Sequence, residues 1–152
     1  MTDDDFERLQ SLVASRAGFR LGRDRINLAE HRLAPVARAH NFDSVEDLLA
    51  SLWAQPVASL GWAVIEALLN TETWFRRDRR PFDIVADELI PAIARVRPNG
   101  LVRILSAGCS TGQEAYSLAM AGLKTQAHTD IVAVDLSPRA IERATRGVYT
   151  GF

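Results

Sequence analysis

The sequence predicts two parts in one chain: an all-helical N-terminal domain over residues 1–69 and the start of a doubly wound α/β domain over residues 81–152. Apolar residues recur at helical spacing through the first part, and no stretch there alternates as a strand does. From Leu101 onward, an apolar run, a glycine-containing turn, a helical pattern and a second apolar run follow one another, which is typical of a strand–helix–strand unit. Residues 70–80 have neither pattern and are expected to form a linker.

The composition excludes several functional classes. A chain of 152 residues with 47% hydrophobic residues can bury a soluble core, and its net charge of −1 offers no field that would attract nucleic acid or an anionic membrane. No apolar stretch approaches the roughly 20 residues that span a bilayer, so no membrane insertion is expected. The single cysteine, Cys109, cannot form an internal disulfide and suits a reducing cytoplasm. The three histidines are scattered and have no cysteine partners, so no metal site is expected.

Helix signals divide the N-terminal part into four helices. The first follows an acidic start, which suits the positive end of a helix dipole, and ends near Gly18. A second helix, from Asp24 to about Ala39, contains Pro35, which is expected to bend or interrupt it. Ser44 can cap a third helix, and a fourth is expected to begin at Pro56.

The second part begins with a helix that Pro81 opens as its first residue. Strands are expected from Leu101 and over 131–134, with a helix from about Gly112 to Leu123 between them. Ser137 then caps a second helix of the α/β segment.

Two strands are too few for this architecture. Two parallel strands leave unpaired backbone groups at an edge, and we expect Ile104, Ile131 and Val134 to present apolar surface that other elements should cover. Either the chain is the front part of a longer protein, or something outside it, including a second copy, completes the sheet.

The turn after the first strand predicts a nucleoside-containing cofactor. Gly108 and Gly112 let the backbone turn sharply and approach a ligand, and Asp135, at the end of the second strand, can accept hydrogen bonds from ribose hydroxyls. The turn departs from G-x-G-x-x-G, with cysteine and serine inside it, which disfavours NAD and favours a cofactor without a diphosphate. The alternative is an ordinary tight connection between a strand and a helix.

Two further features have competing interpretations. Cys109 lies near a helix N-terminus and could be a nucleophile, although a small filler residue is the better interpretation because no base lies nearby in sequence. Residues 71–78 combine aromatic and arginine side chains, which either line a ligand cleft or form a solvated charge run beside buried aromatics. On the residues alone these two interpretations of 71–78 are equal.

Five segments together carry a resemblance to a known family. They are Ala17–Leu21, Arg25–Pro35, Glu72–Asp78, Ser106–Ser117 and Ala144–Tyr149. On these segments the sequence resembles the chemotaxis receptor methyltransferases, the CheR family, over essentially the whole chain. Glu72–Asp78 is similar to that family's linker motif, and Ser106–Ser117 to its cofactor motif.

The sequence departs from that family's pattern in three ways. Thr71 stands where the family usually has asparagine, unless Asn70 takes that role by a shift of one residue. Arg76 replaces the second phenylalanine of the linker motif and brings a charge to a normally apolar place. The family's later strands and its β-subdomain would lie beyond Phe152.

The resemblance implies a Rossmann-like methyltransferase domain that uses S-adenosyl-L-methionine, releases S-adenosyl-L-homocysteine and methylates glutamates in the cytoplasmic methylation region of a chemoreceptor. It implies that Asp135 binds the ribose, that Glu114 contacts the cofactor near the loop, and that Arg77 lies near the methionine carboxylate or the incoming glutamate as the catalytic candidate. The complete implied cofactor-binding set is Thr71, Thr73, Arg77, Ala107, Gly108, Glu114 and Asp135.

The basic residues Arg25, Arg32 and Arg38 are candidates to contact an acidic receptor region, with ordinary solvated helix charges as the alternative. Two other functions stay open. The chain could be a truncated form that binds a receptor or partner without catalysis, or part of a nicotinamide-dependent oxidoreductase. The 152-residue chain alone is expected to be inactive.

Overall fold

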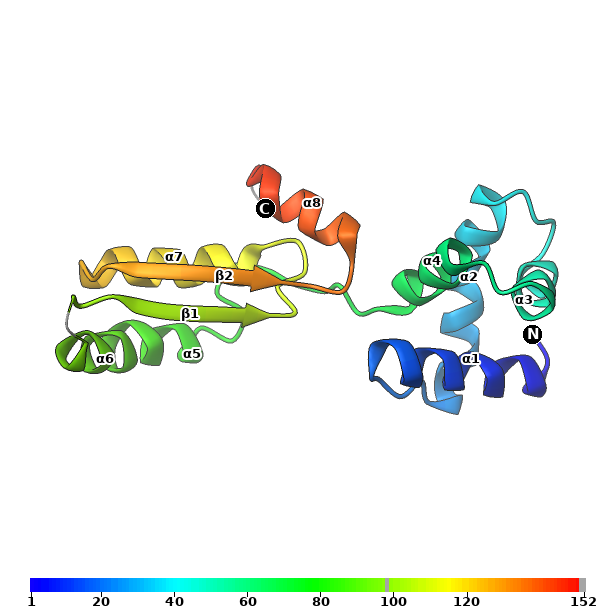
Figure 1. Ribbon diagram of the computed structural model, residues 1–152, viewed down its shortest axis with the longest axis horizontal. Coiled ribbons are helices and arrows are strands. Elements are labelled where there is room, and N and C mark those ends of the chain that lie inside the picture. Colours follow the sequence, from blue (N-terminus) through cyan, green and yellow to red (C-terminus); the bar gives the residue numbers. More distant parts are fainter. Residues whose placement is uncertain (98, 151–152) are drawn as a thin grey trace. The chain divides into compact units, whose positions relative to one another are not determined.

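A computed structural model describes residues 1–97 and 99–150 of the chain. The chain divides after Asn70 into two compact units, each with its own packing (Figure 1). The first unit is helical, and the second contains both strands of the described residues.

The first unit consists of α1 (Asp3–Ala17), the short 3₁₀ helix η1 (Arg23–Arg25), α2 (Ile26–Ala39), α3 (Val45–Ala54) and α4 (Ala58–Leu68). The caps explain several of these boundaries. The Thr2 and Asp5 side chains form a reciprocal capping box at the start of α1, and the Ser44 hydroxyl accepts a hydrogen bond from the Asp47 N–H at the start of α3. The predicted end of the first helix at Gly18 and the predicted cap at Ser44 are confirmed.

One continuous core holds the first unit together. Its fully buried side chains include Phe6 and Leu9 from α1, Leu33 from α2, Leu49 from α3 and Val64 from α4. Burial of such side chains contributes about 1.5–3 kcal/mol each, so this core is the main source of stability in the unit.

The expectation that Pro35 would bend or interrupt the second helix needs correction, because α2 continues through it to Ala39. Ala29, Leu33 and Ala37 lie one turn apart and are all buried, so core packing holds the helix together despite the hydrogen bond that proline cannot donate. The fourth helix begins at Ala58, two residues after the predicted start at Pro56.

The second unit opens with a continuous helical stretch made of α5 (Arg80–Ile84), the π-helical turn η2 (Val85–Leu89) and α6 (Ile90–Val96). Then follow β1 (Val102–Ala107), α7 (Gln113–Thr125), β2 (Thr129–Val134) and α8 (Pro138–Arg146). The Ser137 hydroxyl caps α8 by accepting from the Ala140 N–H at 3.0 Å, as predicted.

β1 and β2 are parallel neighbours, with Ile104 opposite Ile131 and Leu105 opposite Val132 (Figure 1). α7 packs against both strands and against η2, while α6 contacts β1. A parallel pair joined by a helix places the ends of both strands at the same edge of the sheet, where loops can form a site.

The two faces of the sheet differ, and the expectation about its apolar surface is partly wrong. Ile104 and Ile131 are half-buried, whereas Leu105, Val132 and Val134 are 64%, 54% and 47% exposed. Side chains alternate between the faces of a strand, so these three residues share the second face. The exposed apolar surface is therefore formed by Leu105, Val132 and Val134.

Candidate functional site

The site is built around the loop that follows β1. Gly108, Ser110 and Gly112 have φ values of 81°, 49° and 99°, so the backbone repeatedly enters the left-handed region between the strand and α7. The N–H groups of Gly108 and Cys109 both donate to the Val134 carbonyl, at 2.8 and 3.0 Å. These two bonds fasten the loop, residues 108–112, to the end of β2.

Asp135 is the first residue after β2, and its half-buried carboxylate organises the neighbouring backbone. Its Oδ2 accepts from the Ser110 N–H at 2.8 Å, and its Oδ1 accepts from the Ser137 N–H at 2.9 Å. A carboxylate offers about four lone-pair sites, so these bonds leave capacity for ligand hydroxyls. Asp135 and the glycine-containing loop therefore lie side by side.

Open space lies beside Gly108. A Cβ built on this residue would have no neighbour within 4 Å, and Ala107 and Gly108 are both exposed. Gly112 is different, because a Cβ there would lie 2.5 Å from the Tyr149 hydroxyl and 2.9 Å from the Ala144 Cβ. Gly108 therefore leaves room for a ligand, while Gly112 allows α8 and the following segment to pack closely.

Glu114 lies in the first turn of α7 and is exposed. Its Oε1 accepts a hydrogen bond from the Ser106 hydroxyl at 2.6 Å, and Ser106 is itself buried at the end of β1. This bond orients the carboxylate at the loop while its second oxygen can accept further hydrogen bonds.

Cys109 fits the interpretation of a small filler residue. Its side chain is 1% exposed, and burial, together with the negative charge of Asp135, raises the pKa of the thiol above its usual value. A raised pKa disfavours the reactive thiolate.

The linker residues lie along the loop and α7 within the second unit. The Ser110 hydroxyl donates to the Thr71 carbonyl at 2.8 Å, and the Arg76 N–H donates to the Ser117 hydroxyl at 2.9 Å. The Phe75 ring meets the Tyr149 ring edge-on, with centroids 5.0 Å apart. The structure therefore brings the linker motif and the cofactor motif together.

The two neighbouring arginines of the linker have different surroundings. The Arg77 guanidinium lies 4.7 Å from the centroid of the Trp74 ring and donates to the Glu72 carbonyl at 3.2 Å. A guanidinium has five N–H donors, so Arg77 can still bind a carboxylate. Arg76 instead forms an exposed ion pair with Asp83. Thr73, the remaining candidate of the linker, is half-buried.

Sequence reasoning did not assign Tyr149 to the site. Its hydroxyl donates to the Thr111 carbonyl at 2.6 Å, and its ring contacts Tyr116 as well as Phe75. Burial raises the pKa of the Tyr149 phenol, so its hydroxyl stays protonated and able to donate. Only its place in the family-like segment after the second strand could have drawn attention to it.

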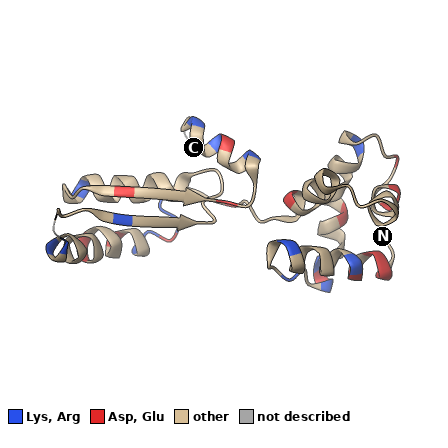
Figure 2. Cartoon of the chain, in the orientation of Figure 1, with Lys and Arg blue, Asp and Glu red and all other residues tan. Residues whose placement is uncertain are grey.

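The three receptor-contact candidates belong to the first unit, where Figure 2 shows charges of both signs on the helices. Arg25 and Arg38 are exposed at the two ends of α2. Arg32 is half-buried and donates to the carbonyls of Leu68 and Leu69, at 3.2 and 3.0 Å, so it closes the end of α4.

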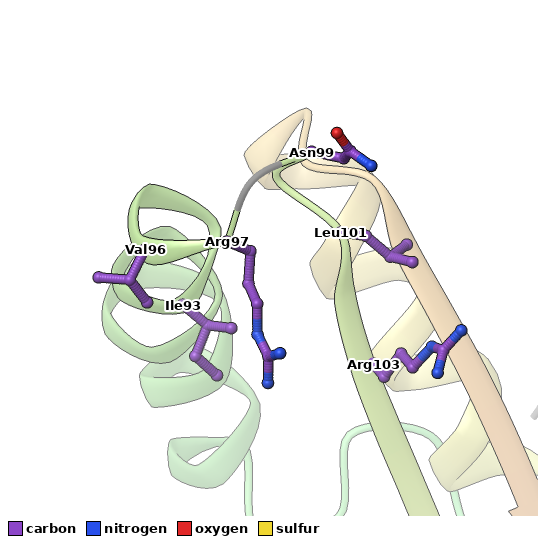
Figure 3. A pocket seen from close by; sticks show the side chains of 6 residues that line it. All are labelled: Ile93, Val96, Arg97, Asn99, Leu101 and Arg103. Carbon is purple, nitrogen blue, oxygen red and sulfur yellow. The ribbon is translucent and has the colours of Figure 1, made fainter.

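A separate hollow of about 480 Å³ lies at the other end of β1 (Figure 3). Its lining residues are Ile93, Val96, Arg97, Asn99, Leu101 and Arg103. It adjoins the start of β1, whereas the glycine-containing loop follows the end of the strand. This hollow is therefore distinct from the candidate site.

Within residues 1–97 and 99–150, no group of three or more histidine, cysteine, aspartate or glutamate side chains is arranged to hold a metal ion. In the same described residues, no helix combines the length and the apolar character needed to cross a membrane.

Comparison with known proteins defines the class. Residues 4–69 match the all-alpha domain of CheR methyltransferases, and residues 71–152 match the CheR methyltransferase SAM binding domain. The chain belongs to the CheR methyltransferase family, and its second unit matches the SAM binding domain of that family.

Several relatives span nearly the whole chain. It is 33% identical to a chemotaxis protein methyltransferase of Vibrio parahaemolyticus and 32% identical to chemotaxis protein methyltransferase Cher2 of Pseudomonas putida, over 98% and 95% of the chain. It covers 56% of the length of each of these two relatives. A shorter match, 40% identical over 57% of the chain and 21% of the relative, is to a probable biofilm formation methyltransferase of Pseudomonas aeruginosa.

Proposed function

We propose that the protein containing this chain transfers the methyl group of S-adenosylmethionine to glutamate side chains of a chemoreceptor in the cytoplasm. One observation supports this function most directly. The Asp135 carboxylate, bonded to the Ser110 N–H, lies at the end of β2 beside the loop in which Gly108 opens onto free space. This is the arrangement that a nucleoside ligand needs, with acceptors for ribose hydroxyls next to a backbone that can be approached closely.

In this proposal, each candidate residue has a role that its surroundings allow. Asp135 accepts hydrogen bonds from the ribose. Glu114 contacts the cofactor near the loop, and the hydrogen bond from Ser106 orients the Glu114 carboxylate. Ala107 and Gly108 line the open side of the loop. Thr71 and Thr73 contribute polar groups from the linker, which Ser110 ties to the loop.

Arg77 is the proposed catalytic residue. Its guanidinium stacks on Trp74 and is exposed, so it can form a charge-assisted pair with the methionine carboxylate or the substrate glutamate. A glutamate carboxylate has a pKa of about 4.3 and is already ionised at neutral pH, so it needs no general base. Rate enhancement would come mainly from aligning its oxygen with the methyl carbon.

The acidic receptor region is the proposed macromolecular partner. Arg25 and Arg38 present exposed positive charges on the first unit and are the better candidates to meet it. Arg32 is a weaker candidate, because its guanidinium already bonds the end of α4. S-adenosylhomocysteine would be the product on the cofactor side.

Methyl transfer tests the function. The longest natural gene product that contains this sequence would be incubated with a receptor cytoplasmic fragment and with S-adenosylmethionine labelled in its methyl group. A matched fragment in which the acceptor glutamates are glutamines is the control. We expect label in the first fragment only, released by alkali as methanol because the product is an ester. No label, or label in both fragments alike, would contradict the function.

The 152-residue chain is the second arm of this experiment. We expect it to transfer no methyl groups alone, because it covers 56% of the length of its methyltransferase relatives. If only this chain occurs naturally and it binds a receptor fragment without methylating it, the non-catalytic alternative holds instead.

A further inference from the structure

We infer that Tyr149 is a positioning residue that holds the glycine-containing loop and the linker in the geometry that the cofactor site requires. The expected effect of Tyr149 on cofactor binding rests on the proposed function. The contacts of Tyr149 with the loop and the linker do not depend on that function. Tyr149 lies after α8, 38 residues beyond the loop carbonyl that it bonds.

The hydroxyl group makes the first contact. It donates to the Thr111 carbonyl at 2.6 Å, at the point where the loop turns into α7. The next residue, Gly112, has a φ of 99° and no room for a side chain, because the Tyr149 hydroxyl would lie 2.5 Å from its Cβ. The Tyr149 hydroxyl thus occupies the space that a side chain at Gly112 would need, and its bond to Thr111 holds the last residues of the loop in place.

The ring makes the second contact. It packs edge-on against Phe75 of the linker, at 5.0 Å between centroids, and against Tyr116 of α7, at 5.6 Å. Edge-to-face pairs at these separations are favourable beyond the area that they bury. One side chain therefore joins the loop and the linker, two of the segments that contribute residues to the proposed cofactor site.

The same two segments meet a second time at Ser110. Its hydroxyl donates to the Thr71 carbonyl, and its N–H donates to Asp135. Ser110 is buried and has a φ of 49°, a conformation that a non-glycine residue seldom adopts without support. Tyr149 holds the other end of the loop. Loss of its bond to Thr111 is therefore expected to weaken the Ser110–Asp135 bond and, as a result, to disturb the proposed ribose site.

A pair of matched variants separates this role from general stability. Tyr149→Phe keeps the ring and removes only the hydroxyl bond to Thr111. Tyr116→Phe removes a hydroxyl bond of similar length, 3.0 Å, to the Ala144 carbonyl in α8 rather than to the loop. Both variants retain all three rings of the contact, so neither is expected to unfold the unit.

The first measurement is amide hydrogen exchange of the chain without cofactor, resolved by residue. The N–H groups of Ser110 and Gly112 are bonded to Asp135 and to the Cys109 carbonyl. We expect both to exchange about two- to tenfold faster in Tyr149→Phe, the range that loss of one hydrogen bond gives, and at the parent rate in Tyr116→Phe. Unchanged exchange in Tyr149→Phe, or equal acceleration in both variants, would overturn the inference.

The second measurement is the Kd with which the longest natural gene product that contains this sequence binds S-adenosylhomocysteine. We expect Tyr149→Phe to raise it about two- to tenfold and Tyr116→Phe to leave it unchanged, with kcat altered less than KM. A loosened loop with unchanged Kd would overturn the link to the site. If the parent binds no S-adenosylhomocysteine, the proposed function fails, and hydrogen exchange still decides whether Tyr149 positions the loop.

Discussion

The Asp135 carboxylate accepts a hydrogen bond from the Ser110 N–H at 2.8 Å, across 25 residues of sequence. This bond joins the end of β2 to the loop after β1, and the second carboxylate oxygen holds the Ser137 N–H at the start of α8. Asp135 therefore stabilises the loop conformation, and we propose that its remaining lone pairs accept hydrogen bonds from a ligand.

Replacement of Asp135 by alanine is expected to weaken S-adenosylhomocysteine binding by about 1.5–3 kcal/mol, the usual range for hydrogen bonds to a charged group. Calorimetry on a protein whose parent form binds measurably would test this. Asp130→Ala is the matched control, because Asp130 is an exposed aspartate within β2 that pairs with Arg103 instead. Unchanged affinity in Asp135→Ala would remove this residue from the site.

The two linker arginines should respond differently to substitution. Arg77→Ala is expected to reduce receptor methylation severely, because it removes the exposed guanidinium that Trp74 orients. Arg76→Phe should be tolerated, since it removes an exposed ion pair with Asp83, an interaction worth about 0–1 kcal/mol. Methylation rates and thermal unfolding of both variants provide the test. Reversed effects would mean that the motif is shifted by one residue, with Asn70 rather than Thr71 at the family's asparagine position.

The uncovered face of the sheet predicts the behaviour of the isolated chain. Leu105, Val132 and Val134 expose apolar surface together, so we expect the 152-residue chain to self-associate through the second unit or to keep that unit loosely ordered. Light scattering and hydrogen exchange would test this, with Leu105→Gln plus Val132→Thr expected to reduce association. Strong protection of both units in a monomer would contradict it.

The first unit carries a pH-dependent contribution at its N-terminus. Hydrogen bonds from the Thr2 side chain and from the Trp53 indole lower the pKa of Asp5. A lowered folded-state pKa gives stability that is present above the unfolded value of about 3.9 and is lost as the pH falls through the folded-state value. We therefore expect Asp5→Ala to cost about 0.3–1.5 kcal/mol at pH 7, the usual range for one capping-box or first-turn charge interaction.

Chemical unfolding of the first unit at pH 7 and near pH 2 provides the measurement, and the difference between parent and Asp5→Ala should shrink at the lower pH. Asp4→Ala is the control, because Asp4 is an exposed residue of the same turn with only a 4.0 Å contact to Arg8. A difference that stays constant with pH would show that the charge of Asp5 does not contribute.

Local sequence signals predicted much of the fold. Caps and helix breakers act within a few residues, so the starts at Ser44 and Ser137 and the end at Gly18 could be predicted from sequence. The uninterrupted path of α2 through Pro35 could not, since it depends on burial of one helix face against other helices.

The expected exposure of the strand residues is right for Val134 and wrong for Ile104 and Ile131, for a physical reason. Strands of parallel sheets are often apolar on both sides, so a continuous apolar run does not reveal which side a helix covers. Ile104 was expected to be uncovered, whereas Leu105 is the exposed neighbour.

One feature of the candidate site could likewise be predicted from sequence, and another could not. The proximity of the loop and Asp135 follows from the geometry of a strand–helix–strand unit and could be predicted. The bond from Tyr149 to Thr111 depends on the path of the chain after α8, which no local pattern specifies.

We propose that the loop after β1 and Asp135 bind S-adenosylmethionine rather than a dinucleotide. Parallel calorimetric titrations test this cofactor preference most directly. They use the longest natural gene product that contains this sequence, with S-adenosylhomocysteine in one titration and NAD in the other. We expect saturable binding of S-adenosylhomocysteine, weakened in Asp135→Ala, and no measurable binding of NAD. Tighter binding of NAD, or binding of S-adenosylhomocysteine that Asp135→Ala leaves unchanged, would contradict it.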